Sequence, residues 1–306
     1  MPSTGSRSSR AALAVFVGAI LWGIVWYPMR LLEGAGLHGL WLAFALYAAA
    51  LLATLPVALR ALAPLARSPG WLALLALAAG WTNIGFVQAV LEGNVLRVLL
   101  LFYLSPLWAT LLSRLLLRER ITPLAAASLG IAMLGALIML WNPALGAPWP
   151  EGRADWYALT AGLAFATSNV ATRGAQAVPI ATKLLCVFFG VTAMSAVLIA
   201  ALGPAPPAIG AGAIAGAMAL GFFGIMAMTW LIQYGVTHIP VYRSAVITFV
   251  ELVAGAVSQA LLTDEVVTPQ EWLGGALIVL GAWLTARASG AAPQGAPGRE
   301  RADAPR

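Results

Sequence analysis

The sequence predicts an all-α integral membrane protein with ten transmembrane helices, arranged as two inverted five-helix repeats. Of its 306 residues, 61% are apolar and 9% are charged, against about 25% charged residues in an ordinary soluble domain. The mean hydropathy is +0.89. Long apolar segments follow one another along the chain, and its two halves resemble each other. A spanning helix needs about 20 apolar residues, so ten helices use about 200 and leave only short loops.

This composition excludes several classes of protein. So few charges cannot cover the surface of a soluble domain, which excludes a cytosolic enzyme and a nucleic-acid-binding protein. The single cysteine, Cys186, excludes an intrachain disulfide and a cysteine-cluster metal site. His38 and His238 show no metal-ligand spacing, and no phosphate-binding loop motif for ATP occurs. We therefore predict no metal, no cofactor and no catalytic residues.

Ten helices are predicted from the apolar segments, which are separated by turn residues such as GAG, EGN, TP and GPAPP. The first segment is too long and too rich in aromatic residues for a cleaved signal peptide. The segments are also too long for strands, and helices satisfy their own backbone groups in lipid. The predicted ranges are 11–31, 38–59, 70–91, 94–117, 122–141, 155–174, 180–202, 210–236, 241–262 and 268–287.

The cationic residues predict the orientation of these helices. With the N-terminus in the cytoplasm, fourteen of the 17 Lys and Arg residues lie on the cytoplasmic side, and only Arg30, Arg97 and Arg153 lie outside. Cytoplasmic loops carry an excess of Lys and Arg, so both termini are expected in the cytoplasm. Nearly all of the cations are Arg and there are 31 Gly, which is typical of a GC-rich bacterial genome and places the chain in a bacterial inner membrane.

The domain organisation follows from these ranges. Residues 1–10 form a cytoplasmic tail, and residues 11–142 form the first five-helix repeat. A periplasmic linker at 143–154 leads to the second repeat at 155–287. Residues 288–306 are rich in Ala, Pro and Gly, which predicts a disordered cytoplasmic tail.

An internal repeat supports the inverted architecture. A shift of 146 residues aligns 115–140 with 260–285; it pairs Glu119 with Glu265, Gly135 with Gly281, and Arg97 with Arg243. Near the start of each half, a shift of 143 pairs Trp22 with Phe165 and Arg30 with Arg173. Because each half has five helices, an odd number, the second half enters the membrane in the opposite direction. Inverted repeats are typical of secondary transporters.

Three segments carry a family resemblance. They are GAILWGIVWYPMRLL (18–32), YLSPLWATLLSRLLLRERIT (103–122) and TFVELVAGAVSQALLTDEVVT (248–268). With these motifs the chain resembles the drug/metabolite transporter superfamily, in particular its EamA-type ten-helix exporters. Leu252 stands where the last motif usually has Pro. The resemblance covers residues 11–287 and implies a central cavity surrounded by helices 1, 3, 4, 6, 8 and 9.

Glu251 is the first candidate functional residue, because it lies near the middle of the ninth predicted helix. A carboxylate at that depth is costly unless it is paired or hydrated. Its expected role is proton coupling or binding of an amino group, and the alternative is a structural pair with a neighbouring helix. Arg97 and Arg243 are candidate gate or anion-binding residues, and the alternative for both is interfacial snorkelling.

Polar and aromatic residues within the spans are expected to line the cavity, although each alone also fits an interhelical hydrogen bond or an interfacial belt. The predicted lining residues are Trp22, Trp26, Trp81, Asn83, Gln88, Tyr103, Ser168, Asn169, Trp230, Gln233 and Tyr234.

The sequence therefore predicts a secondary transporter that exports small metabolites by alternating access. Amino acids, including aromatic ones, are the expected substrates. An exchanger or importer of phosphorylated or nucleotide-linked sugars is an alternative, as are a membrane enzyme and an assembly subunit. The expected partners are a small-molecule substrate and the lipid bilayer, with no nucleic acid. A monomer can suffice because one chain contains both repeats.

Overall fold

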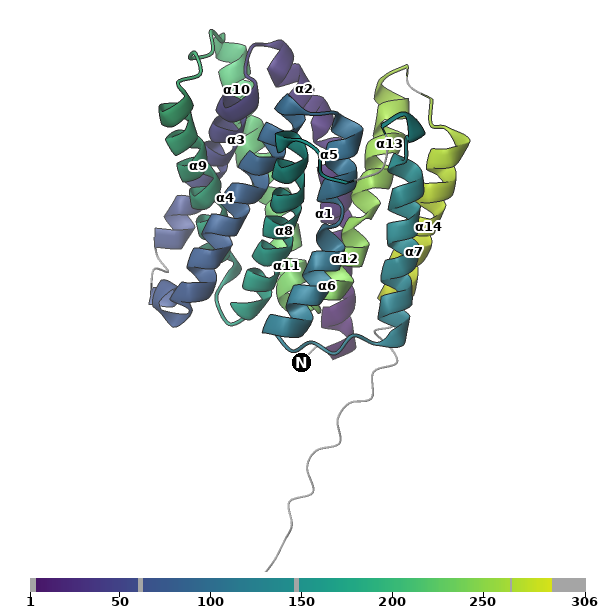
Figure 1. Ribbon diagram of the computed structural model, residues 1–306. Helices are drawn as coiled ribbons and strands as arrows, with labels where there is room; N and C mark the ends of the chain where they lie inside the picture. The colour runs from purple at the N-terminus through teal and green to yellow at the C-terminus, as the bar shows by residue number, and fades with distance from the viewer. Residues whose placement is uncertain (1–3, 60–62, 146–148, 265, 288–306) are drawn as a thin grey trace, which may run out of the picture.

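The computed structural model describes residues 4–59, 63–145, 149–264 and 266–287. Within these ranges every regular element is helical (Figure 1). The first half contains α1 (Thr4–Ile24), α2 (Trp26–Gly34), α3 (Gly39–Leu59), the short 3-10 helix η1 (Ala63–Arg67), α4 (Pro69–Glu92), α5 (Val95–Phe102), α6 (Ser105–Leu116), α7 (Pro123–Leu140) and the 3-10 turn η2 (Pro143–Leu145). The second half contains α8 (Arg153–Gly174), α9 (Ile180–Leu202), α10 (Ala211–Ala219), the π-helix η3 (Leu220–Ile225), α11 (Met226–His238), α12 (Val241–Thr248), α13 (Val250–Leu262) and α14 (Pro269–Arg287).

Within the described chain, eight helical segments are long and apolar enough to cross a membrane. Every predicted helix range is occupied by helix, but α8 and α14 fall outside this set of eight. Helix α8 carries three charged residues and many small or polar ones. It packs against α4, α5 and α6, so protein rather than lipid surrounds much of it, and small residues suit such contacts.

Helix α1 begins at Thr4, whereas a tail was expected up to residue 10. No Pro interrupts residues 4–10, so the polar segment continues the helix beyond its apolar part. Helix α8 likewise begins at Arg153, two residues before the predicted start. The predicted C-terminal tail lies outside the described residues.

Several predicted helices are interrupted. The first is divided at Val25 into α1 and α2, and the fourth is divided at Tyr103 and Leu104 into α5 and α6. Pro106 lies in the first turn of α6 and cannot donate to the carbonyl four residues earlier, which explains the second break. The ninth is divided at Phe249 into α12 and α13 although Leu252 replaces the family proline.

Two bundles pack side by side, and each combines helices of both halves. The first bundle contains α4, α5, α6 and α8, and the second contains α1, α11, α12 and α13. Helix α8 thus packs with the first half of the chain, and α1 packs with the second half. Helices α3, α9 and α10 lie at one side of this arrangement, and α7 and α14 pair at the other (Figure 1).

Close packing of α7 on α14 depends on glycines at reciprocal positions. A Cβ atom on Gly135 would lie 2.6 Å from the carbonyl oxygen of Gly274, and one on Gly281 would lie 2.8 Å from that of Ser128. The repeat shift of 146 residues converts Gly135 into Gly281 and Ser128 into Gly274, so the two contacts are equivalent. As the residue number rises along α7, the partner's number falls along α14, so the two helices are antiparallel.

The start of α1, the α6–α7 loop and the starts of α9 and α12 lie at one end of the molecule (bottom of Figure 1). We name this end the N-terminal face. The opposite face carries the α2–α3, α4–α5 and α9–α10 loops and the segment before α8.

Candidate functional site

The central feature of the site is the contact between two helix breaks. Tyr103 ends α5 in the first bundle, and Phe249 separates α12 from α13 in the second bundle. Their rings are stacked, with centroids 6.0 Å apart and planes at 24°. The repeat shift of 146 residues converts Tyr103 into Phe249, so the residues in contact occupy equivalent positions of the two halves.

Glu251 lies two residues after this break, in the first turn of α13. Its carboxylate is in hydrogen-bonding contact with the Tyr103 hydroxyl. The ion pairs found among the described residues do not include Glu251. A half-buried carboxylate beside a phenol and aromatic rings has the chemistry to bind a proton, an amino group or another organic cation.

Further aromatic residues extend this contact. The centroid of the Phe102 ring lies 5.6 Å from the ring centroid of Tyr103, 5.0 Å from that of Phe86 and 5.7 Å from that of Phe165. Phe102 and Phe249 were not predicted as site residues. The repeat alignment pairs Phe249 with Tyr103, so the sequence did contain a signal for Phe249.

Four predicted lining residues make hydrogen bonds between helices, and one of them is Gln233, which accepts from Thr172. The Trp26 indole donates to Ser258 Oγ at 2.8 Å, and the Trp81 indole donates to Thr160 Oγ1 at 3.2 Å. Asn83 Oδ1 accepts from the Tyr47 hydroxyl at 2.6 Å. These bonds fit the structural alternative for each residue.

The remaining predicted lining residues lie in different environments. Trp22 packs against the apolar core that α3, α4 and α9 share, and Gln88 is half-buried. The Ser168 hydroxyl donates to the Phe165 carbonyl of its own helix, and Asn169 is buried. Among all the predicted lining residues, the described contacts join Tyr103 to Glu251, and Trp230 to Tyr234 through ring stacking at 5.5 Å. Trp230 is exposed.

The two candidate gate arginines differ in their surroundings. The Arg97 guanidinium lies 3.0 Å from Asp155 and 3.4 Å from Glu151, and it donates to the Trp149 carbonyl. It therefore joins the start of α5 to the start of α8 at the opposite face. Arg243 is buried in α12, which excludes simple snorkelling into water for this residue.

A polar cluster at the N-terminal face was not predicted as a site. Glu119 Oε2 accepts from the backbone N–H of Val241 at 3.0 Å, and Glu119 Oε1 lies 3.5 Å from Arg173 Nε. Arg173 also donates to the Thr237 carbonyl. Lys183, fully buried, donates to the Thr172 carbonyl at 2.9 Å and to Thr237 Oγ1 at 2.8 Å.

Glu119 lies in the α6–α7 loop, outside the membrane-spanning helices. Burial raises the pKa of its carboxyl group, while the Val241 N–H and the Arg173 charge act in the opposite direction. In the sequence, Glu119 only aligns the two repeats, because a loop carboxylate gives no sign that the fold will bury it.

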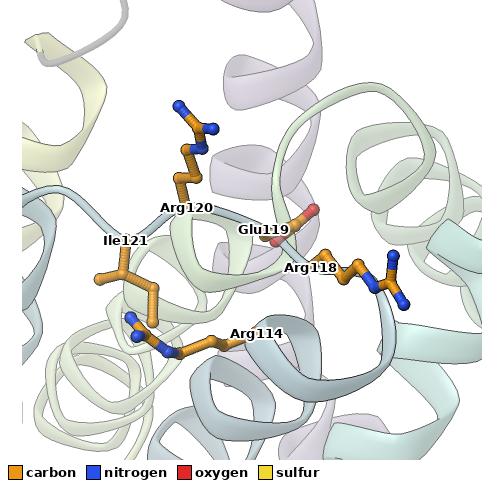
Figure 2. A pocket seen from close by; sticks show the side chains of 5 residues that line it. All are labelled: Arg114, Arg118, Glu119, Arg120 and Ile121. Atoms are coloured by element: carbon orange, nitrogen blue, oxygen red, sulfur yellow. The ribbon is translucent and has the colours of Figure 1, made fainter.

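The neighbouring residues form a shallow pocket of about 450 Å³. Figure 2 shows Arg118 and Arg120 on either side of Glu119, with their guanidinium groups pointing in different directions. Arg114 and Ile121 complete the lining. Three arginines therefore give this part of the N-terminal face a positive charge.

The described residues contain no group of three His, Cys, Asp or Glu side chains that could hold a metal ion. A further polar contact joins the two bundles: Thr172 Oγ1 of α8 donates to Gln233 Oε1 of α11 at 2.9 Å. Gln233, a predicted lining residue, thus connects α11 to α8 near Lys183.

Comparisons with known proteins identify the family. The sequence matches the EamA-like transporter family twice, over residues 9–141 and 152–287. A solved structure described as "Crystal structure of protein" has a TM-score of 0.73 and 20% identity, and the alignment covers 91% of this chain and 98% of that one. No curated protein matches the sequence. The two matches together span most of the chain, and the chain therefore belongs to the EamA-like transporter family of the drug/metabolite transporter superfamily.

Proposed function

We propose that this membrane transporter exports small metabolites, most of all amino acids and among them aromatic ones, by alternating access. The observation that carries the proposal is the contact of Tyr103 with Glu251 between the two bundles. A carboxylate there would bind the amino group of a substrate or a coupling proton, and the aromatic rings of Tyr103, Phe249 and Phe102 would stack on an apolar or aromatic side chain. Substrate binding would then depend on both bundles at once.

The ten-helix inverted repeat is part of the same proposal. The reciprocal glycine contacts of α7 and α14 and the stacking of Tyr103 on Phe249 support it, because both relate equivalent positions of the two halves. Two similar halves with opposed directions can exchange conformations. Inward-open and outward-open states of similar energy would result.

We propose a bacterial inner membrane as the location, with both termini and the N-terminal face in the cytoplasm. The excess of Lys and Arg on that side supports this orientation. The segment with residues 143–154 would then be periplasmic. A single chain provides both bundles, and we propose no catalytic residue, cofactor or metal for the transport step.

The other predicted lining residues have weaker support as substrate-binding residues. Trp81, Asn83 and Trp26 have protein partners, so their contribution to substrate binding would require these hydrogen bonds to change during the cycle. Arg97 and Arg243 would act as gate or anion-binding residues only in a state in which their surroundings rearrange.

Reconstituted liposomes test the proposal. Labelled amino acids, aromatic, aliphatic and basic in separate assays, are offered with and without a proton gradient. Flux of at least one amino acid above protein-free liposomes is expected. Absence of flux for all of them would contradict the substrate assignment, and flux of a phosphorylated sugar instead would favour the alternative substrate class.

A further inference from the structure

Polar contacts join the two bundles at the N-terminal face. Glu119 follows α6 in the first bundle and accepts from the N–H of Val241, the first residue of α12 in the second bundle, at 3.0 Å. Arg173, at the end of α8 in the first bundle, lies 3.5 Å from Glu119 and donates to the carbonyl of Thr237 in α11, 2.6 Å away. A carboxylate and a guanidinium therefore hold the starts and ends of four helices together.

Lys183 strengthens the same region. Its ammonium group, 0% exposed, donates to the Thr172 carbonyl of α8 and to Thr237 Oγ1 of α11. A buried ammonium without hydrogen-bond partners would be costly. The contact between α8 and α11 must therefore stay closed for Lys183 to keep both partners.

At the opposite face the described ion pairs stay within the first bundle and the segment that precedes α8. They are Arg97–Asp155, Arg97–Glu151 and Arg153–Glu92. At the N-terminal face the Glu119–Arg173 ion pair also lies within the first bundle, but both side chains bond to the second bundle as well, Glu119 to the Val241 N–H and Arg173 to the Thr237 carbonyl. The two faces therefore differ in how charge connects the bundles.

Equivalent positions of the repeat show the same difference. Arg173 is half-buried and paired, whereas Arg30, its equivalent at a shift of 143, is exposed. Helix α5 has its own cap, because Asn94 Oδ1 accepts from the N–H groups of Leu96 and Arg97. Helix α12 follows Pro240, which offers no side-chain cap, and its first N–H is satisfied by Glu119. The position equivalent to Glu119, residue 265, lies outside the described residues.

The chain turns sharply at Arg118, just after α6 ends. Arg118 has a φ of 55°, a left-handed conformation that non-glycine residues rarely adopt. This turn lets the Glu119 N–H bond to the Ser113 carbonyl at 3.2 Å. The carboxylate then points between α8 and α12 instead of into the solvent. Strain of this kind persists where surrounding contacts fix the backbone.

We propose that Glu119 is a positioning residue that closes the N-terminal face by fastening the first bundle to the start of α12. The inference rests on the proposed alternating access. With these contacts formed, the N-terminal face is closed and the opposite face is the one that opens. Release of Glu119 from Val241 and Arg173 frees α12 and opens the N-terminal face.

Cysteine labelling tests this gate without any knowledge of the substrate. In a Cys186→Ser background, which removes the single native cysteine, Ser244→Cys reports on the N-terminal face. Ser258→Cys reports on general loosening, because the Ser258 hydroxyl contacts the Gly23 carbonyl of α1 inside the second bundle. Both serines are buried, at 1% and 6% exposure. The purified protein in liposomes is treated with a maleimide, and the labelling rate is compared with and without Glu119→Ala.

Glu119→Ala is expected to raise the labelling rate of Ser244→Cys at least about fivefold, because a charge-assisted contact is lost, and to leave that of Ser258→Cys unchanged. Glu119→Gln keeps an acceptor for Val241 but loses the charge, and an intermediate effect is expected. Glu151→Ala is the matched control, because Glu151 pairs with Arg97 at the opposite face, and it should leave the Ser244→Cys rate unchanged.

Two outcomes would overturn the inference. An unchanged rate at Ser244→Cys in Glu119→Ala would show that the contact does not close this face. Faster labelling of both reporters would show general loosening of the fold, not a gate. Because labelling needs no substrate, failure of the amino acid flux assay leaves this result unaffected, and the two failures are distinguishable.

Discussion

Tyr103 and Phe249 stack on each other at 6.0 Å although 146 residues separate them in the chain. Both lie where a spanning helix is broken, one break in each bundle. Glu251 contacts the hydroxyl of Tyr103 beside this stack. The stack therefore places the contact of Tyr103 with Glu251 at the boundary between the two bundles.

Removal of the Tyr103 hydroxyl tests the role of this contact. Tyr103→Phe keeps the ring and its stacking, but it removes a hydrogen bond to a carboxylate, which is worth about 1.5–3 kcal/mol. We expect amino acid flux to fall about tenfold or more, while the protein stays folded and its thermal midpoint in detergent falls by only a few degrees. Tyr27→Phe, on a half-buried tyrosine of α2, should retain full flux. Equal flux in both variants would remove the Tyr103 hydroxyl from the mechanism.

Glycine substitutions in α7 test how closely α7 packs on α14. Gly135→Ala places a Cβ 2.6 Å from the Gly274 carbonyl oxygen, and overpacking of this kind costs about 1–3 kcal/mol. Gly130→Ala on the same helix meets nothing within 4 Å and should stabilise the helix by up to about 1 kcal/mol. Thermal unfolding in detergent should therefore show opposite shifts. A shift of the same sign in both variants would contradict the packing described here.

The burial of Glu119 predicts a pH dependence of stability. Its folded-state pKa is raised from 4.5, so the folded protein binds this proton more tightly than the unfolded chain. The stability linked to this proton is present below pH 4.5 and is lost as the pH rises through the higher folded-state pKa. Relative to Glu119→Gln, the native chain should lose stability across that window. A constant difference in thermal midpoint between the two proteins over this range would contradict the prediction.

Much of the fold could be predicted from the sequence, because apolar length decides which segments cross a membrane. The predicted ranges all contain helix, and the resemblance to the EamA family is confirmed by the two matches over the chain. The break at Phe249 was harder to predict, because no proline marks it.

The site was only partly predictable. Glu251 was visible as a carboxylate in an apolar segment, and its contact with Tyr103 joins two of the predicted residues. Lys183 was only one of the cations that indicate the orientation, and Glu119 only aligned the repeats, because nothing in the local sequence shows that tertiary contacts bury them. The partners of Asn83 and Trp81 also come from other helices, which spacing along one helix does not reveal.

The role of Glu251 in transport is tested by proton-gradient-driven flux of an amino acid through liposomes containing Glu251→Gln. The amide keeps the size of the side chain but cannot carry the charge or exchange the proton. We predict that gradient-driven flux falls to the level of protein-free liposomes, while Glu33→Gln, on an exposed acid at the end of α2, retains native flux. Unchanged gradient-driven flux in Glu251→Gln would contradict the account.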